Sequence, residues 1–269
     1  MSQDTRETLR HDQMPVLFVG HGSPMNAIED NRWSRGFKDL RTYLPRPKII
    51  LSISAHWFIT GTSLTGNERP ETIHDFGGFP SELYRMQYPA PGGPTFALRV
   101  ADLLRDFGAS VRDDWGIDHG TWSVLHHVFP EAECPVVQLS IDQRLAPVDH
   151  LRLGRILRPL RDEGVLIMGT GNIVHNLRHA MLAMQKGEAA TPDWAESFDR
   201  HVSRAVEQRT SESLVEELSS PAGAMSHPTL DHYLPLLYAA GAADEHDEVQ
   251  FPITGFDLSS ISMRSIVWG

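Results

Sequence analysis

The chain has 269 residues, of which 22% are charged and 41% hydrophobic, an ordinary globular composition that can bury a large core. Its formal net charge of -11, from 24 basic and 35 acidic residues, argues against nucleic acid or an anionic membrane as the main partner. The single cysteine, Cys134, excludes an internal disulfide and fits a reducing cytoplasm.

The first segment, residues 1–14, is polar and lacks the apolar core of a signal peptide. We expect it to form an N-terminal arm before a single α/β domain over residues 15–269, and no apolar run approaches the roughly 20 residues that span a bilayer. Val16–Val19 reads as a buried strand, and His21 follows it between two glycines. A histidine there lies where α/β folds place ligands, although a turn that contains a polar residue fits the same pattern.

A second strand with a histidine is predicted after the first helix. The helix is expected over about 31–44, and Lys48–Trp57 then reads as a strand with His56 at its end. If the two strands are parallel neighbours, His21 and His56 lie close together.

The middle of the chain contains two loops that carry histidines. Residues 59–93 are irregular and include IHDFGGFP at 73–80, and a long loop in a compact domain is more often functional than idle. His74 in this loop can contact a ligand or hold the loop by hydrogen bonds. His119 ends the loop DWGIDHG at 114–120. Helices are predicted over 94–107, 121–129 and 147–163, and a strand over 136–141.

Two more histidines occur in similar places in the C-terminal half. The strand Val165–Met168 runs into GTGNIVHN, which contains His175, and His232 lies near the start of an apolar helix predicted over 228–241. The order of elements indicates an α/β fold with three α/β/α layers and a central, largely parallel or mixed sheet. The remaining elements are helices over 193–209 and 211–218 and strand material over 251–256 and 261–268.

Histidines in these positions have the chemistry of a metal site. Neutral imidazole is the commonest metal ligand, and ligands gathered from distant strand ends are typical of catalytic sites. A site built on several thiolates is excluded, because the chain has one cysteine. Spacing does not show convergence in space, so hydrogen-bonded structural histidines remain an alternative at this point.

Six motifs, taken together and in order, give a family resemblance. The chain resembles the LigB-type extradiol ring-cleavage dioxygenases, and among them the DOPA 4,5-dioxygenase branch. The motifs are HGSPMN at 21–26, SAHW at 54–57, HDFGGFP at 74–80, DHGTW at 118–122, GNIVHN at 171–176 and HYLPLLY at 232–238.

The resemblance implies a metal centre with assigned residues. Non-haem Fe²⁺ is expected on the residues that match His21, His56 and His232. His175 is expected beside the metal, as the acid/base or as an added ligand when Zn²⁺ is bound, and His119 in the substrate pocket. The broader superfamily uses two histidines and one carboxylate, whereas the third position here is a histidine, which suits zinc as well as iron.

The implied reaction is extradiol cleavage of a catechol such as L-DOPA by O₂, giving a muconic semialdehyde. Substrate contacts are expected from His119, His74 and Tyr233, and Arg178 or Arg264 are conceivable partners for a substrate carboxylate. A zinc hydrolase and a non-catalytic binding protein on the same scaffold are the alternatives, although no HExxH motif supports the hydrolase. Oligomeric state is open.

Overall fold

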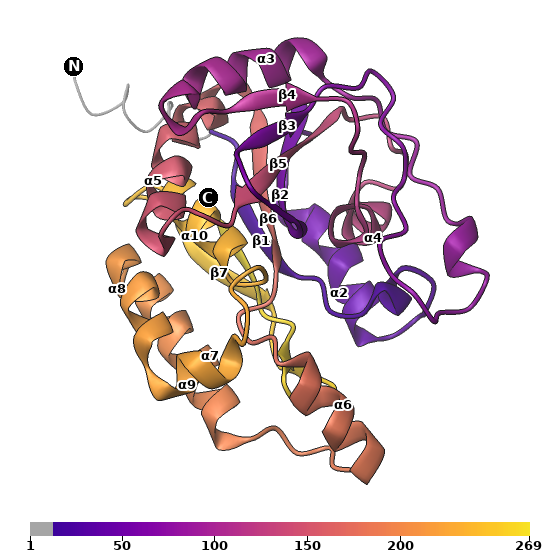
Figure 1. Cartoon of the computed structure of the whole chain (residues 1–269), viewed down its shortest axis with the longest axis vertical. Helices are drawn as coiled ribbons and strands as arrows, with labels where there is room; N and C mark the ends of the chain where they lie inside the picture. The colour runs from indigo at the N-terminus through magenta and orange to yellow at the C-terminus, as the bar shows by residue number, and fades with distance from the viewer. Residues whose placement is uncertain (1–12) are drawn as a thin grey trace.

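A computed structural model describes residues 13–269, and its centre is a mixed β-sheet (Figure 1). Eight strands of the described residues form it: β1 (Val16–Gly20), β2 (Ile49–Ile59), β3 (Ser63–Thr65), β4 (Ser110–Arg112), β5 (Val136–Asp142), β6 (Val165–Gly171), β7 (Val249–Ile253) and β10 (Ser265–Trp268). Their order is β4-β3-β5-β2-β6-β1-β10-β7. The middle strands β5, β2, β6 and β1 pair in parallel, whereas β3 and β10 join them antiparallel, so the expected mixed sheet is confirmed.

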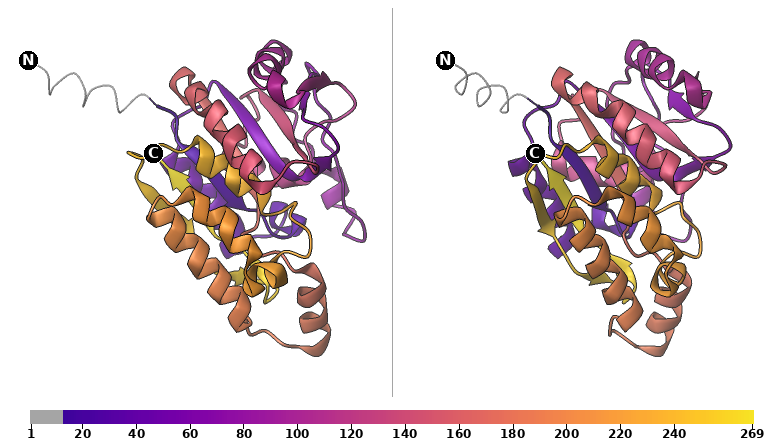
Figure 2. Two further views of the ribbon diagram at one scale, coloured as in Figure 1. Left: turned by 60° about the vertical axis from the view of Figure 1, so that its left-hand side comes forward. Right: turned by 90° about the vertical axis from the view of Figure 1, so that its left-hand side faces the viewer.

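Helices cover both faces of this sheet, as Figure 2 shows from two sides. Because side chains alternate along a strand, Val16 and Phe18 of β1 pack into one core, and Leu17 and Val19 into the other. The first face carries α3 (Pro94–Leu103), α5 (Pro147–Leu157) and α10 (Leu234–Ala242), and the second carries α2 (Arg32–Leu40) and α4 (His119–Val128). The predicted three-layer α/β/α architecture is confirmed.

The strand order does not meet the condition under which His21 and His56 were expected to lie close together. β1 and β2 are not neighbours, because β6 lies between them and pairs in parallel with each. β2 also continues to Ile59, three residues beyond His56. Its pairing with β6 stops at Ser54, and its register with β5 shifts between Ile53 and Phe58. His56 therefore lies where β2 leaves the regular ladder, which frees its side chain to turn toward the edge of the sheet.

Most predicted helices are present with small changes at their ends. Asn31 caps α2, accepting from the backbone N–H groups of Trp33 and Ser34, and the helix continues as a 3₁₀ turn, η2 (Arg41–Tyr43). α4 begins at His119, two residues earlier than predicted, because Asp118 is its N-cap. Pro159 lies just beyond α5, in the 3₁₀ helix η5 (Arg158–Glu163), as expected for a residue that interrupts a helix. Two more 3₁₀ helices, η3 (Leu83–Arg85) and η4 (Arg105–Phe107), lie before and after α3.

The C-terminal half contains the largest departures from prediction. α6 (Leu177–Lys186) was not predicted, although Asn176 caps its start and Gly187 ends it with a positive φ. In Figure 1 it extends away from the sheet, at the lower edge of the molecule. The short helix α9 covers Pro221–Ser226. The expected C-terminal strand material is interrupted by a separate two-stranded sheet. The remaining elements are α7 (Asp193–Glu207), α8 (Ser211–Glu216), the 3₁₀ helices η1 (Pro24–Ala27) and η6 (Glu217–Ser219), and the strands β8 (Phe256–Asp257) and β9 (Ile261–Ser262).

The predicted arm over 1–14 lies outside the described residues except for its last two. Of these, Met14 is buried, and its backbone N–H donates to the carbonyl of Arg161 at 3.1 Å. None of the described helices is long and apolar enough to cross a membrane.

Candidate metal centre

The predicted histidines gather at the carboxyl end of the parallel strands. His21 follows β1 directly, and its N–H donates to the carbonyl of Gly171, the last residue of β6, at 3.1 Å. His175 lies four residues beyond β6, and His232 lies two residues before α10. Parallel strands end at a common edge, so residues far apart in sequence meet there.

Three of these histidines form a compact cluster. The potential ligand atoms of His21, His56 and His232 all lie within 4.8 Å of one another. The Nε2 atoms of His21 and His56 are 3.0 Å apart, and the His232 ring centroid lies 5.4 Å from that of His21 and 5.1 Å from that of His56. The three histidines therefore lie together, although β1 and β2 are not neighbours and β6 separates them.

Burial keeps these imidazoles neutral. It lowers the pKa of His21 and of His232 well below the ordinary value, and the neighbouring histidines lower both further. For His56, burial is again the main cause and lowers the pKa to about 3. A neutral ring carries the lone pair that a metal needs, so the donor set fits a borderline divalent ion such as Fe²⁺ or Zn²⁺.

His175 and His119 lie beside the cluster. The His175 ring stacks on His232, with centroids 3.5 Å apart and planes 1° from parallel, and burial lowers its pKa to about 4. The His119 ring centroid is 3.9 Å from that of His56. Both residues that were predicted to act on substrate are thus adjacent to the predicted metal ligands.

Two carboxylates that sequence reasoning did not select contact the histidines. Asp231 accepts a hydrogen bond from Nδ1 of His232, the next residue in the chain. Asp75 lies 2.9 Å from Nδ1 of His119 and 3.3 Å from Nδ1 of His56. Although burial acts to raise the pKa of Asp75, the hydrogen bond from the His119 ring is the main cause that lowers it overall. The sequence signal was an Asp beside a His in HDFGGFP and in LDHY.

His74 makes contacts of the loop-holding kind that the sequence left open beside a ligand contact. Its Nε2 lies 3.0 Å from the carbonyl oxygen of Met86, and its ring packs beside Trp122 and Phe76. Phe76, which sequence reasoning did not select, lies edge-on to the His119 ring at a centroid distance of 5.4 Å. Phe76 is thus an aromatic side chain of this loop that contacts a clustered histidine, and His74 packs against it.

The expected substrate contact by Tyr233 does not fit its position. Its side chain is fully buried, its hydroxyl donates to the carbonyl of Leu214 at 2.8 Å, and its ring packs on Phe198 and His227. This places Tyr233 in the core behind His232, because its polar atom already has a partner there. Arg264 is likewise committed, in an ion pair with Asp199.

A buried network holds the His119 end of α4. Asp118 accepts hydrogen bonds from Ser54 of β2 at 2.7 Å and from the amide of Gln138 of β5 at 2.6 Å. Burial raises the pKa of Asp118 to about 6. Since Asp118 also caps α4, this network fixes the position of His119 relative to the strand that carries His56.

Two glycines allow the elements to approach closely at this edge. A Cβ on Gly120 would lie 2.8 Å from Cδ2 of His56, and one on Gly171 would lie 2.1 Å from the carbonyl oxygen of His232. Any side chain at either position would displace an imidazole of the cluster. This explains why glycines occur in DHGTW and GNIVHN.

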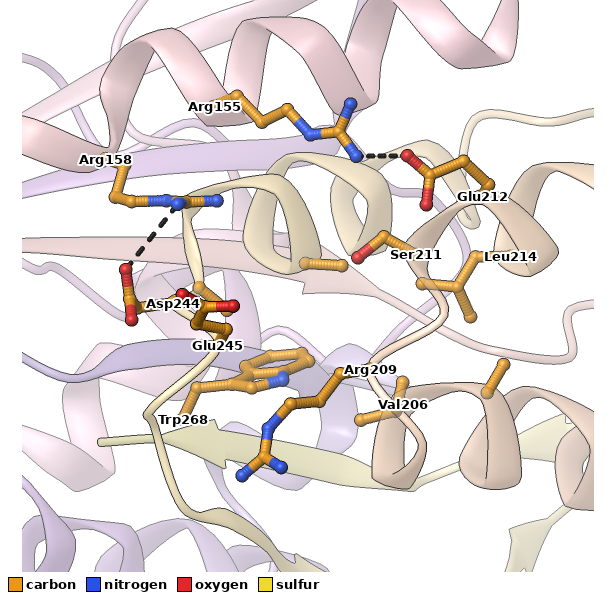
Figure 3. Close-up of a pocket in the computed structure, with 13 residues that line it drawn as sticks. Arg155, Arg158, Val206, Arg209, Ser211, Glu212, Leu214, Asp244, Glu245 and Trp268 are labelled. Carbon is orange, nitrogen blue, oxygen red and sulfur yellow. Dashed lines mark hydrogen bonds and ion pairs between the residues drawn. The ribbon is translucent and has the colours of Figure 1, made fainter.

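A cavity of about 370 Å³ lies at the opposite end of the sheet from the histidine cluster (Figure 3). Its floor includes Trp268, which pairs with the first residue of β1. Arg155 and Arg158 enter it from α5 and its extension, and each has an acidic partner, Glu212 and Asp244 respectively. The cavity's cations are thus largely neutralised by the chain itself, and no histidine lines it.

A three-layer α/β protein with clustered neutral histidines at the carboxyl edge of its sheet is the framework of a metal-dependent enzyme. The family model described as the catalytic LigB subunit of aromatic ring-opening dioxygenase matches residues 15–265. The chain belongs to this family and is a ring-opening dioxygenase, an oxidoreductase, as the motif resemblance predicted.

Individual relatives are similar along nearly their whole length. The chain is 45% identical to the 4,5-DOPA dioxygenase extradiol of Escherichia coli K12, over 96% of this chain and 95% of that protein. It is 38% identical to the protein of the same name from Beta vulgaris, over 93% and 94%. A crystal structure of an uncharacterized protein from E. coli K12 superimposes with a TM-score of 0.83 at 40% identity, covering 96% of this chain and 100% of that one.

Proposed function

We propose that the chain cleaves the ring of L-DOPA or a similar substituted catechol at the 4,5-position, using O₂ and Fe²⁺. The names of its relatives from E. coli and Beta vulgaris support the substrate class. The observation that carries the chemistry is the cluster of His21, His56 and His232, with His175 stacked against it.

In this proposal His21, His56 and His232 hold the metal. All three present neutral imidazoles, and two of them have a carboxylate within reach of Nδ1 that orients the ring. Bound Fe²⁺ would supply activation of O₂ and a lower pKa for the catechol hydroxyl groups. Zn²⁺ fits the same nitrogen donors, so it is the ion we expect to compete for the site.

His175 is the proton acceptor in the proposed reaction. Its ring is unprotonated at neutral pH because burial lowers its pKa to about 4. Its contact with His232 places it at the edge of the ligand cluster, within reach of a hydroxyl group of a bound catechol. The protonated His175 ring then returns the proton to an oxygen atom of the ring-opened product.

His119 and Phe76 form the opposite wall. Phe76 makes a T-shaped contact with the His119 ring, so the two rings form one wall against which a planar aromatic substrate would bind. His119 would hydrogen-bond the second hydroxyl group of the substrate. The C–C bond beside the diol breaks, both atoms of O₂ enter the muconic semialdehyde, and the catechol supplies all the electrons, so no external reductant is required.

Oxygen uptake by anaerobically iron-loaded protein tests this function. We expect stoichiometric O₂ consumption with L-DOPA and formation of a coloured semialdehyde, with slower turnover of unsubstituted catechol. Absence of uptake with every catechol, at normal iron content, would contradict the proposal. Ester hydrolysis with zinc, or tight catechol binding without turnover, would favour the hydrolase or the binding protein instead.

The cellular setting is part of the proposal. A reducing cytoplasm is supported by the single cysteine, whose buried thiol at Cys134 has a pKa raised by burial to about 11. Fe²⁺ is also easier to retain in a reducing compartment. Fractionation of cells that express the protein would test this setting.

A further inference from the structure

Asp75 makes an unusual pair of contacts at the edge of the histidine cluster. Its Oδ1 lies 2.9 Å from Nδ1 of His119 and also accepts the backbone N–H of His119 at 3.0 Å. Its Oδ2 lies 3.3 Å from Nδ1 of His56. A single carboxylate thus contacts a proposed metal ligand and a proposed substrate-binding residue at the same time.

The other proposed ligands are supported differently. Asp231 contacts His232 alone among the clustered histidines, and within residues 13–269 Nδ1 of His21 is buried without a hydrogen-bond partner. Asp75 is therefore the carboxylate that connects the two walls of the site. It comes from the loop between β3 and η3, whereas His56 comes from β2 and His119 from α4.

These contacts determine which nitrogen of each ring carries hydrogen. A carboxylate only accepts, so Nδ1 of a neutral His119 donates to Asp75 and its Nε2 keeps a lone pair. Nδ1 of His56 lies 3.3 Å from the negatively charged Oδ2, which favours hydrogen on Nδ1 and leaves Nε2 of His56, 3.0 Å from that of His21, as the electron-pair donor. In solution both rings would exchange freely between the two forms.

We propose that Asp75 is a positioning residue that sets the tautomers of His56 and His119 together, making His56 a metal donor and His119 a hydrogen-bond acceptor for a substrate hydroxyl group. The part of this proposal that concerns His119 and the substrate rests on the proposed function. Nε2 of His119 accepts a hydrogen bond, so it would bind a catechol whose hydroxyl group is still protonated. It would discriminate against substrates that have only a hydrogen-bond acceptor at that position.

A second metal ion is the competing interpretation of the same atoms, because His56, Asp75 and His119 also lie within ligand distance of one another. The backbone contact favours hydrogen bonding. Oδ1 of Asp75 already receives two N–H groups of His119, which occupies it as an acceptor. The two interpretations differ in metal stoichiometry, which is measurable.

The variant Asp75→Asn tests whether Asp75 acts through the ring tautomers or only through the space that its side chain fills. The amide keeps the size of the side chain and one oxygen for the backbone N–H of His119, but it no longer offers an acceptor to both rings. Glu82→Gln is the matched control: it removes a carboxylate from the N-cap of η3, in the same loop, where Glu82 is exposed and makes no capping hydrogen bond.

The experiment combines ¹⁵N NMR of the histidine rings in metal-free protein with calorimetric titration of Zn²⁺. We expect His119 in the wild type to be the Nδ1–H tautomer and one Zn²⁺ to bind. In Asp75→Asn the amide NH₂ replaces the oxygen that faces His56, so the His56 ring should shift toward the Nε2–H form and Zn²⁺ binding should weaken by about 10- to 100-fold. Glu82→Gln should change neither measurement.

Unchanged ring tautomers in Asp75→Asn, or a Zn²⁺ affinity within twofold of wild type, would overturn the proposal. Two Zn²⁺ per wild-type chain and one in Asp75→Asn would overturn it in favour of a second ion. Neither readout needs turnover, so protein that shows these shifts yet consumes no O₂ would contradict the proposed function alone. In iron-loaded enzyme that is active, we expect Asp75→Asn to lower kcat more than it raises KM.

Discussion

The two ends of the sheet bury polar groups in opposite ways. At one end Arg161 is fully buried, and its guanidinium donates to both carboxylate oxygens of Asp247, at 2.7 and 2.8 Å, and to the carbonyls of Met14 and Ala242. We call these four residues the arginine clamp. At the other end the histidine cluster contains Nδ1 of His21, which has no partner among the described residues.

This difference indicates that the arginine clamp serves stability and the histidine cluster serves chemistry. A fully satisfied buried ion pair fixes the structure and leaves nothing free to react. The histidine cluster keeps lone pairs available at a cost in stability, because burial disfavours the charged rings and Nδ1 of His21 has no partner among the described residues. We therefore expect variants of the cluster to lose activity while the fold survives, and variants of the clamp to do the reverse.

The largest expected effect is from His21→Ala. Loss of one of three proposed ligands should reduce metal content to background and lower kcat by more than the roughly 100-fold typical of ligand-supporting residues. Metal analysis and O₂ uptake measure this, and circular dichroism should show an unchanged fold. Retained stoichiometric metal in this variant would contradict the assignment of His21 as a ligand.

The next effect is from His175→Phe, which keeps an aromatic ring stacked on His232. We expect kcat to fall by about 10²- to 10⁴-fold with little change in KM, because a proton acceptor is lost. Iron content by elemental analysis should stay at the wild-type level. A simultaneous loss of iron would show that His175 is a ligand rather than only the acid/base.

The clamp should give the opposite result. Arg161→Met leaves Asp247 buried and unpaired, so the free energy of unfolding should fall by about 3–5 kcal/mol, measured by urea denaturation. The control is Arg99→Met, which breaks the exposed Arg99–Glu163 pair and should cost at most about 1 kcal/mol. At low temperature, kcat per folded Arg161→Met molecule should equal that of wild type. A large drop in kcat would contradict the assignment of stability to the clamp and of chemistry to the histidine cluster.

The smallest effect concerns pH and a buried histidine outside the centre. Burial lowers the pKa of His150 to about 4, and its Nδ1 lies 3.0 Å from the hydroxyl oxygen of Tyr238. The unfolded ring binds a proton near pH 6.5, so its contribution is fully present above that pH and is lost as pH falls toward 4.

His150→Asn removes this titration. The unfolding free energy of metal-free wild type should fall with decreasing pH more steeply than that of the variant, by up to about 1.4 kcal/mol per pH unit between pH 6 and 4.5. Urea denaturation across this range measures the two slopes. Parallel slopes would show that His150 accepts its proton without unfolding.

Local patterns in the sequence predicted the elements well where apolar runs end in strong boundary residues. The strand before His21 ends at glycine, and Asn31 caps α2, so both boundaries follow from backbone preferences alone. α6 was missed, although Asn176 and Gly187 mark its two ends; its larger apolar side chains, Leu177 and Met181 among them, are about half exposed, and only small alanines are buried.

Contacts between distant segments were harder to predict. The insertion of β6 between β1 and β2 depends on strand order, which no periodicity encodes. The same limit applies to Tyr233, since its neighbour His232 belongs to the site while Tyr233 itself turns into the core. Adjacent residues before a helix point in different directions, and only packing shows which one faces the ligand cluster.

The sequence by itself determined the fold class, the family and the identity of the clustered imidazoles, because short motifs of glycine and histidine at strand ends carry that information locally. Only the tertiary structure decided that Nε2 of His21 meets Nε2 of His56 and that Asp75 contacts both His56 and His119. Those contacts join four separate segments, and their geometry is fixed by the packing of strands, helix and loop around one edge of the sheet.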